Sequence, residues 1–281
     1  MDGVYLPRRH PGILFADGGG LKSYWLAYAL GQLNRRGFRV GFFDWELSGE
    51  DHRDRLERLF GADMPDIKYV RCDRPLVYEV DRLKRIREEE QLDYLGFDSV
   101  TFACDGPPEA AEVAAAYFRA VRQMGVIGSL HVAHITKADG GDQKPFGSAF
   151  WHNGARSTWF AKRTDDGVME QTVTLGIFPR KANLGPRRPA VGVEFAFGAE
   201  RTIIRATSLA DVQDLASQLP IRQRMAHLLR SGAMSTKVLA EELSEKLDTV
   251  ERTARRYKNQ FVLVKGHDGS SRLGLLESRP A

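Results

Sequence analysis

The sequence predicts an α/β fold with a mainly parallel sheet, an antiparallel extension at one edge, and a small C-terminal domain. Over the first two-thirds of the chain, short apolar runs alternate with helical stretches, which is typical of a parallel sheet. β-rich segments without intervening helices follow, as expected for antiparallel strands. The C-terminal part carries short helical stretches and a hairpin pattern instead. The expected boundaries are residues 1–208 for the first domain, 209–220 for a linker and 221–281 for the second domain.

The individual elements follow from hydrophobic spacing. The first helix, residues 24–37, is expected because apolar side chains recur there at helical spacing. These side chains are Trp25, Leu26, Ala29, Leu30 and Leu33. Parallel strands are expected at residues 12–16, 38–46, 66–72, 94–103 and 129–137. Further helices are expected at residues 50–61, 79–92 and 107–125. Antiparallel strands are expected at residues 157–163, 167–178, 189–198 and 201–207.

The composition is that of an ordinary globular protein, because 42% of the 281 residues are hydrophobic and the mean hydropathy is −0.37. No stretch approaches the roughly 18 apolar residues of a membrane span. The N-terminal residues lack the apolar core of a signal peptide. The two cysteines, Cys72 and Cys104, fit neither a metal-binding spacing nor a disulfide framework. We therefore expect a cytoplasmic protein without a membrane partner.

The basic charge is concentrated at the C-terminal end. Residues 221–281 hold 12 lysines and arginines against 7 aspartates and glutamates, although the whole chain has a net charge of only +4. A local basic surplus is typical of a surface that binds the phosphate backbone of nucleic acids. On charge alone, a solvated charged surface is an equally good interpretation.

Residues 16–23, Ala-Asp-Gly-Gly-Gly-Leu-Lys-Ser, lie between the first predicted strand and the first predicted helix. Backbone N–H groups, a helix N-terminus and a lysine bind nucleotide phosphates, and this segment offers all three. It departs from the strict Gly-x-x-x-x-Gly-Lys-Ser/Thr pattern, because Ala16 and Leu21 replace the two glycines. The alternative is a glycine-rich turn with an incidental Lys-Ser pair. The residues expected to bind ATP are Asp17, Gly18, Gly19, Gly20, Leu21, Lys22, Ser23 and Tyr24.

Polar residues end three other predicted strands. One strand ends in Asp44-Trp45-Glu46, and within the apolar run 94–103 the residues 94–98 read as a strand that ends in Asp98. A later strand contains His131 and His134. Ligands bind at the carboxyl ends of the strands in α/β sheets, so we expect these side chains near the glycine-rich loop. Each also has a simpler interpretation, as an exposed acid, a turn cap or a structural histidine.

From about residue 12 to about residue 197, these motifs in their order resemble the RecA-type motors of the hexameric replicative helicase group, in particular the plasmid RepA-type helicases. Some of these relatives carry a variant loop of the Gly-Gly-x-x-Lys-Ser type. The resemblance implies a RecA-like P-loop ATPase fold with ATP and Mg²⁺ as cofactors. It also implies a homo-oligomer, expected to be a hexamer, that hydrolyses ATP between subunits and passes single-stranded DNA through a central channel.

The same resemblance implies a role for each polar residue. Lys22 would contact the β- and γ-phosphates, and Ser23 and Asp98 would hold Mg²⁺. Glu46 would activate the attacking water, with the other carboxylate of its strand end as the alternative. His134 would be the sensor that couples the γ-phosphate to DNA-facing loops.

Two further features concern neighbouring subunits. The polar segment 137–159 resembles a DNA-facing loop, and Arg156 within it resembles an arginine that reaches the neighbouring subunit's nucleotide. Lys181 matches a lysine with that role in DnaB-type helicases, but Asn183 stands where that group has an arginine. The other arginines considered for this role are Arg180 and Arg187.

The C-terminal domain matches the pattern of a winged helix-turn-helix. Helices are expected at residues 221–231, 236–246 and 249–258, followed by a hairpin. Ser235 or Thr236 would cap the second helix, and Asp248 or Thr249 the third. The residues expected to contact duplex DNA are Thr249, Arg252, Arg255, Arg256, Lys258, Lys265 and Arg272. The alternative is a protein-interaction module of the same fold.

The leading hypothesis is therefore an ATP-dependent DNA helicase or translocase. The first alternative is a nucleotide-switched DNA-binding regulator or recombinase-like loader, which binds ATP without unwinding DNA. The unusual loop at Ala16 and Leu21 and the asparagine at Asn183 favour this alternative. A second alternative is an inactive ATPase fold that serves as an oligomeric scaffold.

Overall fold

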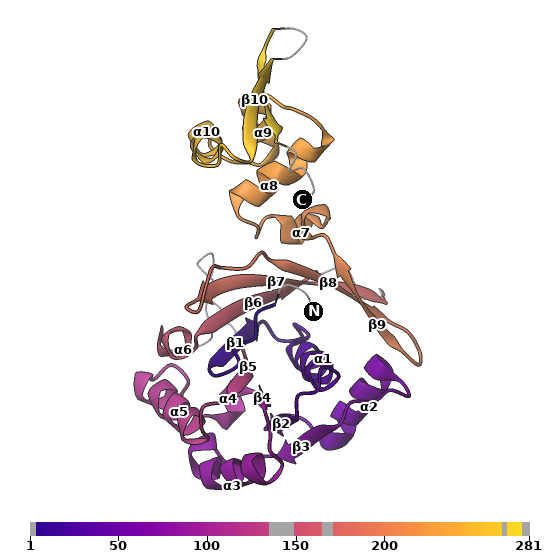
Figure 1. Ribbon diagram of the computed structural model, residues 1–281, viewed down its shortest axis with the longest axis vertical. Coiled ribbons are helices and arrows are strands. Elements are labelled where there is room, and N and C mark those ends of the chain that lie inside the picture. Colours follow the sequence, from indigo (N-terminus) through magenta and orange to yellow (C-terminus); the bar gives the residue numbers. More distant parts are fainter. Residues whose placement is uncertain (1–3, 135–148, 165–170, 266–268, 277–281) are drawn as a thin grey trace. The chain divides into compact units, whose positions relative to one another are not determined.

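A computed structural model describes residues 4–134, 149–164, 171–265 and 269–276 (Figure 1). Contacts between residues divide the chain into two compact units, Met1–Thr207 (unit 1) and Ser208–Ala281 (unit 2). Within the described ranges, no helix combines the length and the apolar character needed to cross a lipid bilayer.

Unit 1 is built on one sheet, in which the described strands follow the order β3-β2-β4-β5-β1-β6-β7-β8-β9. The pairs from β3 to β6 are parallel, and the pairs from β6 to β9 are antiparallel. The predicted mainly parallel sheet with an antiparallel edge is therefore confirmed. The strands are β1 (Pro11–Ala16), β2 (Val40–Asp44), β3 (Ile67–Arg71), β4 (Tyr94–Asp98), β5 (Gly128–His134), β6 (Ser157–Arg163), β7 (Thr172–Ala182), β8 (Val191–Phe197) and β9 (Thr202–Thr207).

Helices cover both faces of this sheet. The helices α1 and α2 lie on one face, and α3 to α6 lie on the other (Figure 1). The antiparallel strands curve around α1, so that α2 reaches β9. The helices are α1 (Lys22–Asn34), α2 (Gly49–Phe60), α3 (Leu76–Glu89), α4 (Val100–Ala103), α5 (Ala111–Gln123) and α6 (Ala149–Gly154).

The apolar face of α1 forms the centre of the larger core. Trp25, Leu26 and Leu30 are almost fully buried, as their spacing predicted. Gly96 in β4 makes this packing possible, because a Cβ atom there would lie 2.6 Å from Leu30 Cδ1. A glycine inside a strand is therefore required here for the close approach of a helix.

Some predicted boundaries were wrong. The apolar run 94–103 forms a strand only as far as Asp98, and Val100–Ala103 is the short helix α4. Apolar character continues past the end of the strand because this helix buries Val100 and Ala103 against the sheet while Phe102 is exposed. An apolar run of this length does not distinguish a strand from a strand followed by a helical turn.

Unit 2 contains helices and a hairpin around its own small core. The predicted cap of the second helix is confirmed, because the Ser235 hydroxyl accepts a hydrogen bond from the Val238 N–H. The predicted cap of the third helix was wrong, because this helix begins at Leu247 after Lys246, which makes no capping bond. The elements are η1 (Leu209–Asp211), α7 (Gln213–Ala216), α8 (Ile221–Leu228), η2 (Leu229–Ser231), α9 (Thr236–Glu242), α10 (Leu247–Arg256), β10 (Phe261–Lys265) and β11 (Ser271–Leu275).

The core of unit 2 joins its helices to the hairpin. Its buried side chains are Met225, Leu229, Leu239, Ala240, Leu243, Val250, Phe261 and Leu273. Strands β10 and β11 pair in antiparallel fashion, and Met234 adds an isolated bridge to Leu273. Residues 209–220, which the sequence suggested as a linker, contain the short helices η1 and α7.

Candidate functional site

Four neighbouring parallel strands carry polar residues at one edge of the sheet. The strands β2, β4, β5 and β1 are adjacent in that order. Their carboxyl ends are followed by, or contain, Glu46, Asp98, His134 and the loop 17–21. Since the strands are parallel, these residues lie at the same edge, as the sequence predicted.

The loop between β1 and α1 is folded around Lys22. The Lys22 Nζ donates hydrogen bonds to the carbonyl oxygens of Asp17, at 2.8 Å, and Ala16, at 3.4 Å. The Asp17 side chain accepts from the Gly18 N–H, and its carbonyl accepts from the Gly20 N–H. These bonds close the loop against the first turn of α1.

Two loop positions depend on glycine for different reasons. Gly19 has a φ of +68°, which side chains rarely adopt. At Gly20 a Cβ atom would lie 2.8 Å from Ala16 Cβ and 2.9 Å from the Asp17 carbonyl oxygen. Leu21 also has a left-handed backbone, with φ 56° and ψ 20°, at the position where the strict pattern has glycine. The backbone at position 21 thus has a conformation that favours glycine, although the residue there is leucine.

Arg163, at the end of β6, supports the same loop. Its Nη1 donates a hydrogen bond of 3.0 Å to the Gly19 carbonyl oxygen. The two residues are far apart in sequence and meet only because β6 pairs with β1. Arg163 could not be predicted from the sequence, since no local pattern links it to the glycine-rich loop.

Lys22 lies among acidic groups. Burial lowers the pKa of Lys22, and the charges of Glu46, Asp98 and Asp17 oppose that shift. Burial also lowers the pKa of His134, and the charge of Lys22 adds to this effect. These residues therefore act on one another electrostatically, although they come from different strands.

Asp98 is the most constrained acid of the site. It is fully buried, and burial raises its pKa to about 6, while the neighbouring Ser23 hydroxyl limits the rise. Neither carboxylate oxygen meets hydrogen-bond geometry with any described residue. Buried carboxylates without hydrogen bonds are rare, so Asp98 has the properties of a ligand for a cation.

Asp44, the alternative to Glu46, is instead held by the protein. Its Oδ1 accepts from the backbone N–H groups of Glu46, at 2.9 Å, and Leu47, at 3.1 Å. Its Oδ2 accepts from the Tyr69 hydroxyl at 2.9 Å. Burial would raise the pKa of Asp44, but hydrogen bonds from His52 and from these N–H groups lower it overall. Glu46 is exposed, and none of the hydrogen bonds found among the described residues holds its carboxylate.

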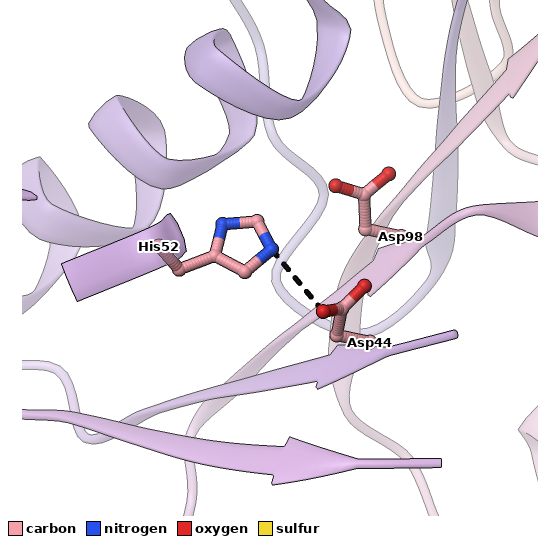
Figure 2. A group of neighbouring side chains, drawn as sticks. All are labelled: Asp44, His52 and Asp98. Carbon is pink, nitrogen blue, oxygen red and sulfur yellow. Dashed lines mark ion pairs between the residues drawn. The ribbon is translucent and has the colours of Figure 1, made fainter. Parts of the chain in front are cut away.

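His52 joins Asp44 and Asp98 in a buried group that the sequence analysis missed (Figure 2). The His52 Nε2 lies 3.3 Å from Asp44 Oδ2, and the ring points between the two carboxylates. A capping box of Ser48 and Asp51 fixes the start of α2. It thereby also fixes the position of His52, which directly follows Asp51. One ligand atom from each of the three residues lies within 4.8 Å of the others.

His131 is a core residue. Its ring is fully buried, with Nδ1 2.8 Å from the Tyr117 hydroxyl and Nε2 2.8 Å from Ser129 Oγ. Burial lowers its pKa to about 3, so the ring is neutral. It stacks on Phe97, on the sheet face that α5 covers. This placement agrees with the preference for His134 at the site.

The Tyr24 side chain is used for packing within unit 1. Its hydroxyl is 2.9 Å from Thr202 Oγ1, and its ring contacts Phe195 and Phe197 edge-on. Among the residues expected to bind ATP, Tyr24 therefore has its side chain turned toward the antiparallel strands. Its backbone still belongs to the first turn of α1.

Arg156 and Lys181 lie at the opposite edge of the sheet. The Arg156 N–H bonds to the carbonyl of Pro11, at the start of β1 and thus one strand length from the loop. The Lys181 Nζ binds the carbonyl oxygens of His152, Asn153 and Ala155 at the end of α6. Neither side chain is placed to reach Lys22 of its own chain. Residues 137–148 of the predicted DNA-facing loop, 137–159, lie outside the described residues.

In unit 2, basic side chains are exposed along α10. Arg252 and Arg255 make long ion pairs within the helix, to Asp248 at 3.8 Å and Glu251 at 3.9 Å. Of the residues expected to contact DNA, the exposed ones are Arg252, Arg255, Arg256, Lys258 and Lys265. Thr249 and Arg272 are partly buried.

A nucleotide with Mg²⁺ fits the residues at the carboxyl edge. A Cβ atom at Gly18 would meet open space, and at Gly19 only the Arg163 side chain at 3.8 Å, so the backbone of the loop can be approached closely. The N-terminus of the 13-residue helix α1 adds N–H donors. The unbonded Asp98 carboxylate beside the Ser23 hydroxyl suits a hard cation.

Comparisons with known proteins identify the fold. No protein-family model and no curated protein sequence matches the chain. The KaiC-like protein PH0186 from Pyrococcus horikoshii matches with a TM-score of 0.54 and 15% identity over 71% of this chain and 91% of its own. A second solved structure, that of an ATPase domain, matches with a TM-score of 0.55 and 12% identity over 71% of this chain and 85% of its own. These likenesses support the RecA-like α/β fold predicted from the sequence.

Proposed function

We propose that this chain is an ATP-dependent DNA helicase or translocase of the RepA-like type, assembled as a hexamer. The observation that carries the proposal is the gathering of Lys22, Glu46 and Asp98 at one sheet edge, within electrostatic reach of one another. The RecA-like fold and the loop before α1 add support, since this is where such folds present backbone donors to a phosphate. ATP and Mg²⁺ are the proposed cofactors.

Each residue at this edge has a separate task in the proposed reaction. Lys22 and the loop N–H groups bind the phosphates, and Glu46 orients the attacking water and takes its proton. Ser23 and Asp98 hold Mg²⁺, which neutralises developing charge on the phosphate oxygens when bound. His134, kept neutral by burial and by Lys22, senses the γ-phosphate from the end of β5.

Arg156 is proposed to act on the nucleotide of a neighbouring subunit. Its place at the opposite edge of the sheet supports a contact in trans, because it is one strand length away from its own loop. Lys181 is proposed for the same interface. Since its Nζ already binds three carbonyl oxygens, its contribution there includes holding the end of α6 beside Arg156.

Unit 2 is proposed to be a winged helix-turn-helix that binds duplex DNA. Three helices and a two-stranded hairpin around a single core support this proposal. The exposed arginines of α10, Arg252, Arg255 and Arg256, are suited to phosphate and base contacts. Thr249, Lys258, Lys265 and Arg272 complete the proposed surface.

The test measures ATP hydrolysis and strand displacement on a forked duplex with wild-type protein, Lys22→Ala and Lys68→Ala. Lys68 is an exposed lysine of β3 that pairs with Glu90, so it controls for the loss of one charge. We expect Lys22→Ala to abolish DNA-stimulated hydrolysis and unwinding, and Lys68→Ala to retain both. Unchanged turnover in Lys22→Ala would refute the assignment of the loop.

The second candidate is a nucleotide-switched DNA-binding regulator or loader. The left-handed leucine at position 21 favours it, because the loop lacks the glycine of the strict pattern. The same assay separates the two functions. Nucleotide binding and turnover without strand displacement would support the switch and contradict the helicase.

A further inference from the structure

The buried group of Asp44, His52 and Asp98 has more polar atoms than the protein satisfies. His52 is 2% exposed and Asp98 is 0% exposed. Nδ1 of His52 and both carboxylate oxygens of Asp98 have no hydrogen-bond partner among the described residues, and Nε2 of His52 has only Asp44 Oδ2 at 3.3 Å. The Ser99 hydroxyl, next to Asp98, is also buried without a partner among these residues. A buried polar atom left in this state costs roughly 1–3 kcal/mol, so several together indicate a ligand.

The geometry indicates that this ligand is a single cation. One donor atom from each of the three residues lies within 4.8 Å of the others, which allows one ion to contact all three. In Figure 2 the His52 ring and the two carboxylates converge from α2, β2 and β4. No lysine or arginine within the described residues forms an ion pair with Asp98, and Lys22 donates to loop carbonyls instead.

The donor set selects the type of cation. Mg²⁺ and Ca²⁺ prefer oxygen ligands, whereas an imidazole nitrogen with two carboxylates suits Mn²⁺, Co²⁺ or Zn²⁺. Asp44 Oδ2 lies 3.3 Å from His52 Nε2, and the Tyr69 hydroxyl donates to the same oxygen. Tyr69 thus orients this carboxylate in the way that outer partners orient metal ligands.

We propose that Asp44, His52 and Asp98 form a binding site for one divalent transition-metal ion, which is filled without nucleotide. The site shares only Asp98 with the proposed nucleotide site and does not depend on ATP binding. It differs from a Mg²⁺ site made by Ser23 and Asp98, because His52 and Asp44 supply the other ligands. A transition-metal ion bound here would be coordinated by the Asp98 carboxylate, which the proposed ATPase uses to hold Mg²⁺.

The test titrates nucleotide-free protein with Co²⁺, followed by calorimetry and by visible absorption. The variants are His52→Gln and the matched control His227→Gln, which changes a histidine of unit 2 that faces Asp211. We expect wild type and His227→Gln to bind one equivalent with equal affinity. His52→Gln is expected to bind at least about tenfold more weakly, because the loss of a direct ligand costs at least as much as the loss of an outer partner of a metal site. Equal Co²⁺ affinity in His52→Gln, or no binding to wild type, would overturn the proposal.

A second measurement does not depend on how the variant folds. Crystals of the wild-type protein soaked in Mn²⁺ are expected to show an anomalous peak about 2.0–2.3 Å from donor atoms of the three residues. An ion located elsewhere, or no peak at saturating Mn²⁺, would contradict the site. Co²⁺ binding in a protein that fails to hydrolyse ATP would leave this inference standing and remove the proposed function. ATP hydrolysis with Mg²⁺ in a protein that does not bind Co²⁺ would leave the proposed function standing and overturn this inference.

Discussion

Asp44 and Asp98 are direct partners at the ends of the neighbouring strands β2 and β4, yet only Asp44 has its carboxylate hydrogen-bonded. Two N–H groups and a tyrosine hydroxyl bind Asp44, whereas Asp98 is buried without such bonds. The same residue type at the same register is thus held by hydrogen bonds to the protein in one strand and is buried without them in the next.

This difference predicts opposite effects of two substitutions on stability. Asp44→Ala leaves two N–H groups and the Tyr69 hydroxyl without their acceptor, so we expect a loss of about 2–5 kcal/mol in the free energy of unfolding. Asp98→Asn removes a buried charge, so the free energy of unfolding is expected to stay the same or rise. Urea denaturation at neutral pH in EDTA measures both. A larger loss in Asp98→Asn than in Asp44→Ala would contradict the assignment.

Stability is also predicted to depend on pH through Asp98. Its pKa is raised from 3.8 to about 6 in the folded protein. The folded state therefore binds this proton more tightly than the unfolded chain, and the resulting stabilisation is present below about pH 4 and lost as the pH rises through about 6. Relative to Asp98→Asn, the wild type should lose on the order of 3 kcal/mol across this range. If the free energy of unfolding of the two proteins changed with pH in the same way in metal-free buffer, the raised pKa of Asp98 would be disproved.

Leu21 provides a test of the strained loop. A left-handed backbone costs a non-glycine residue roughly 1–2 kcal/mol, and Leu21 has a φ of 56°. Both Leu21→Ala and Leu21→Gly lose the packing of the leucine side chain, but only glycine relieves the backbone. We expect Leu21→Gly to be about 1 kcal/mol more stable than Leu21→Ala, the reverse of the order inside a helix. Urea denaturation decides, and a more stable alanine variant would rule out the strain.

The proposed DNA surface predicts a change in salt dependence. Replacing Arg252, Arg255 and Arg256 together by alanine should weaken binding to duplex DNA and lower the slope of log K against log salt by about 0.9 for each phosphate that the variant no longer neutralises. Fluorescence anisotropy at several salt concentrations measures the slope. Arg230→Ala, which removes an exposed arginine of η2, is the control. If the triple variant kept the wild-type slope, α10 would not be the contact surface.

The fold and the placing of several site residues could be predicted from the sequence, because these polar residues stand where apolar runs end. Glu46, Asp98 and His134 each follow or end an apolar run, and parallel pairing brings such ends to one edge. The limits of the elements were harder to predict, since apolar character continues past β4 into α4. Strand β4 is hydrogen-bonded to β2 and β5, whereas α4 is a short helix that packs beside β5.

His52 was missed because its helix is strongly charged. Within residues 49–60 a histidine among acids and arginines resembles a solvated side chain. A signal was nevertheless present, since His52, Leu56 and Phe60 recur every fourth residue and share the buried face of α2. Arg163 had no such signal, because only the pairing of β6 with β1 brings it to the loop.

Lys22 and its loop are proposed to bind a nucleotide phosphate, and a direct binding measurement tests this role most simply. The measurement is the affinity of a fluorescent ATP analogue with Mg²⁺ for wild type, Lys22→Ala and Lys68→Ala. Losing a charged hydrogen bond of roughly 1.5–3 kcal/mol should weaken Lys22→Ala by about tenfold to a hundredfold, with Lys68→Ala unchanged. Equal affinity in wild type and Lys22→Ala, or no binding to wild type, would show that Lys22 and its loop do not bind the nucleotide.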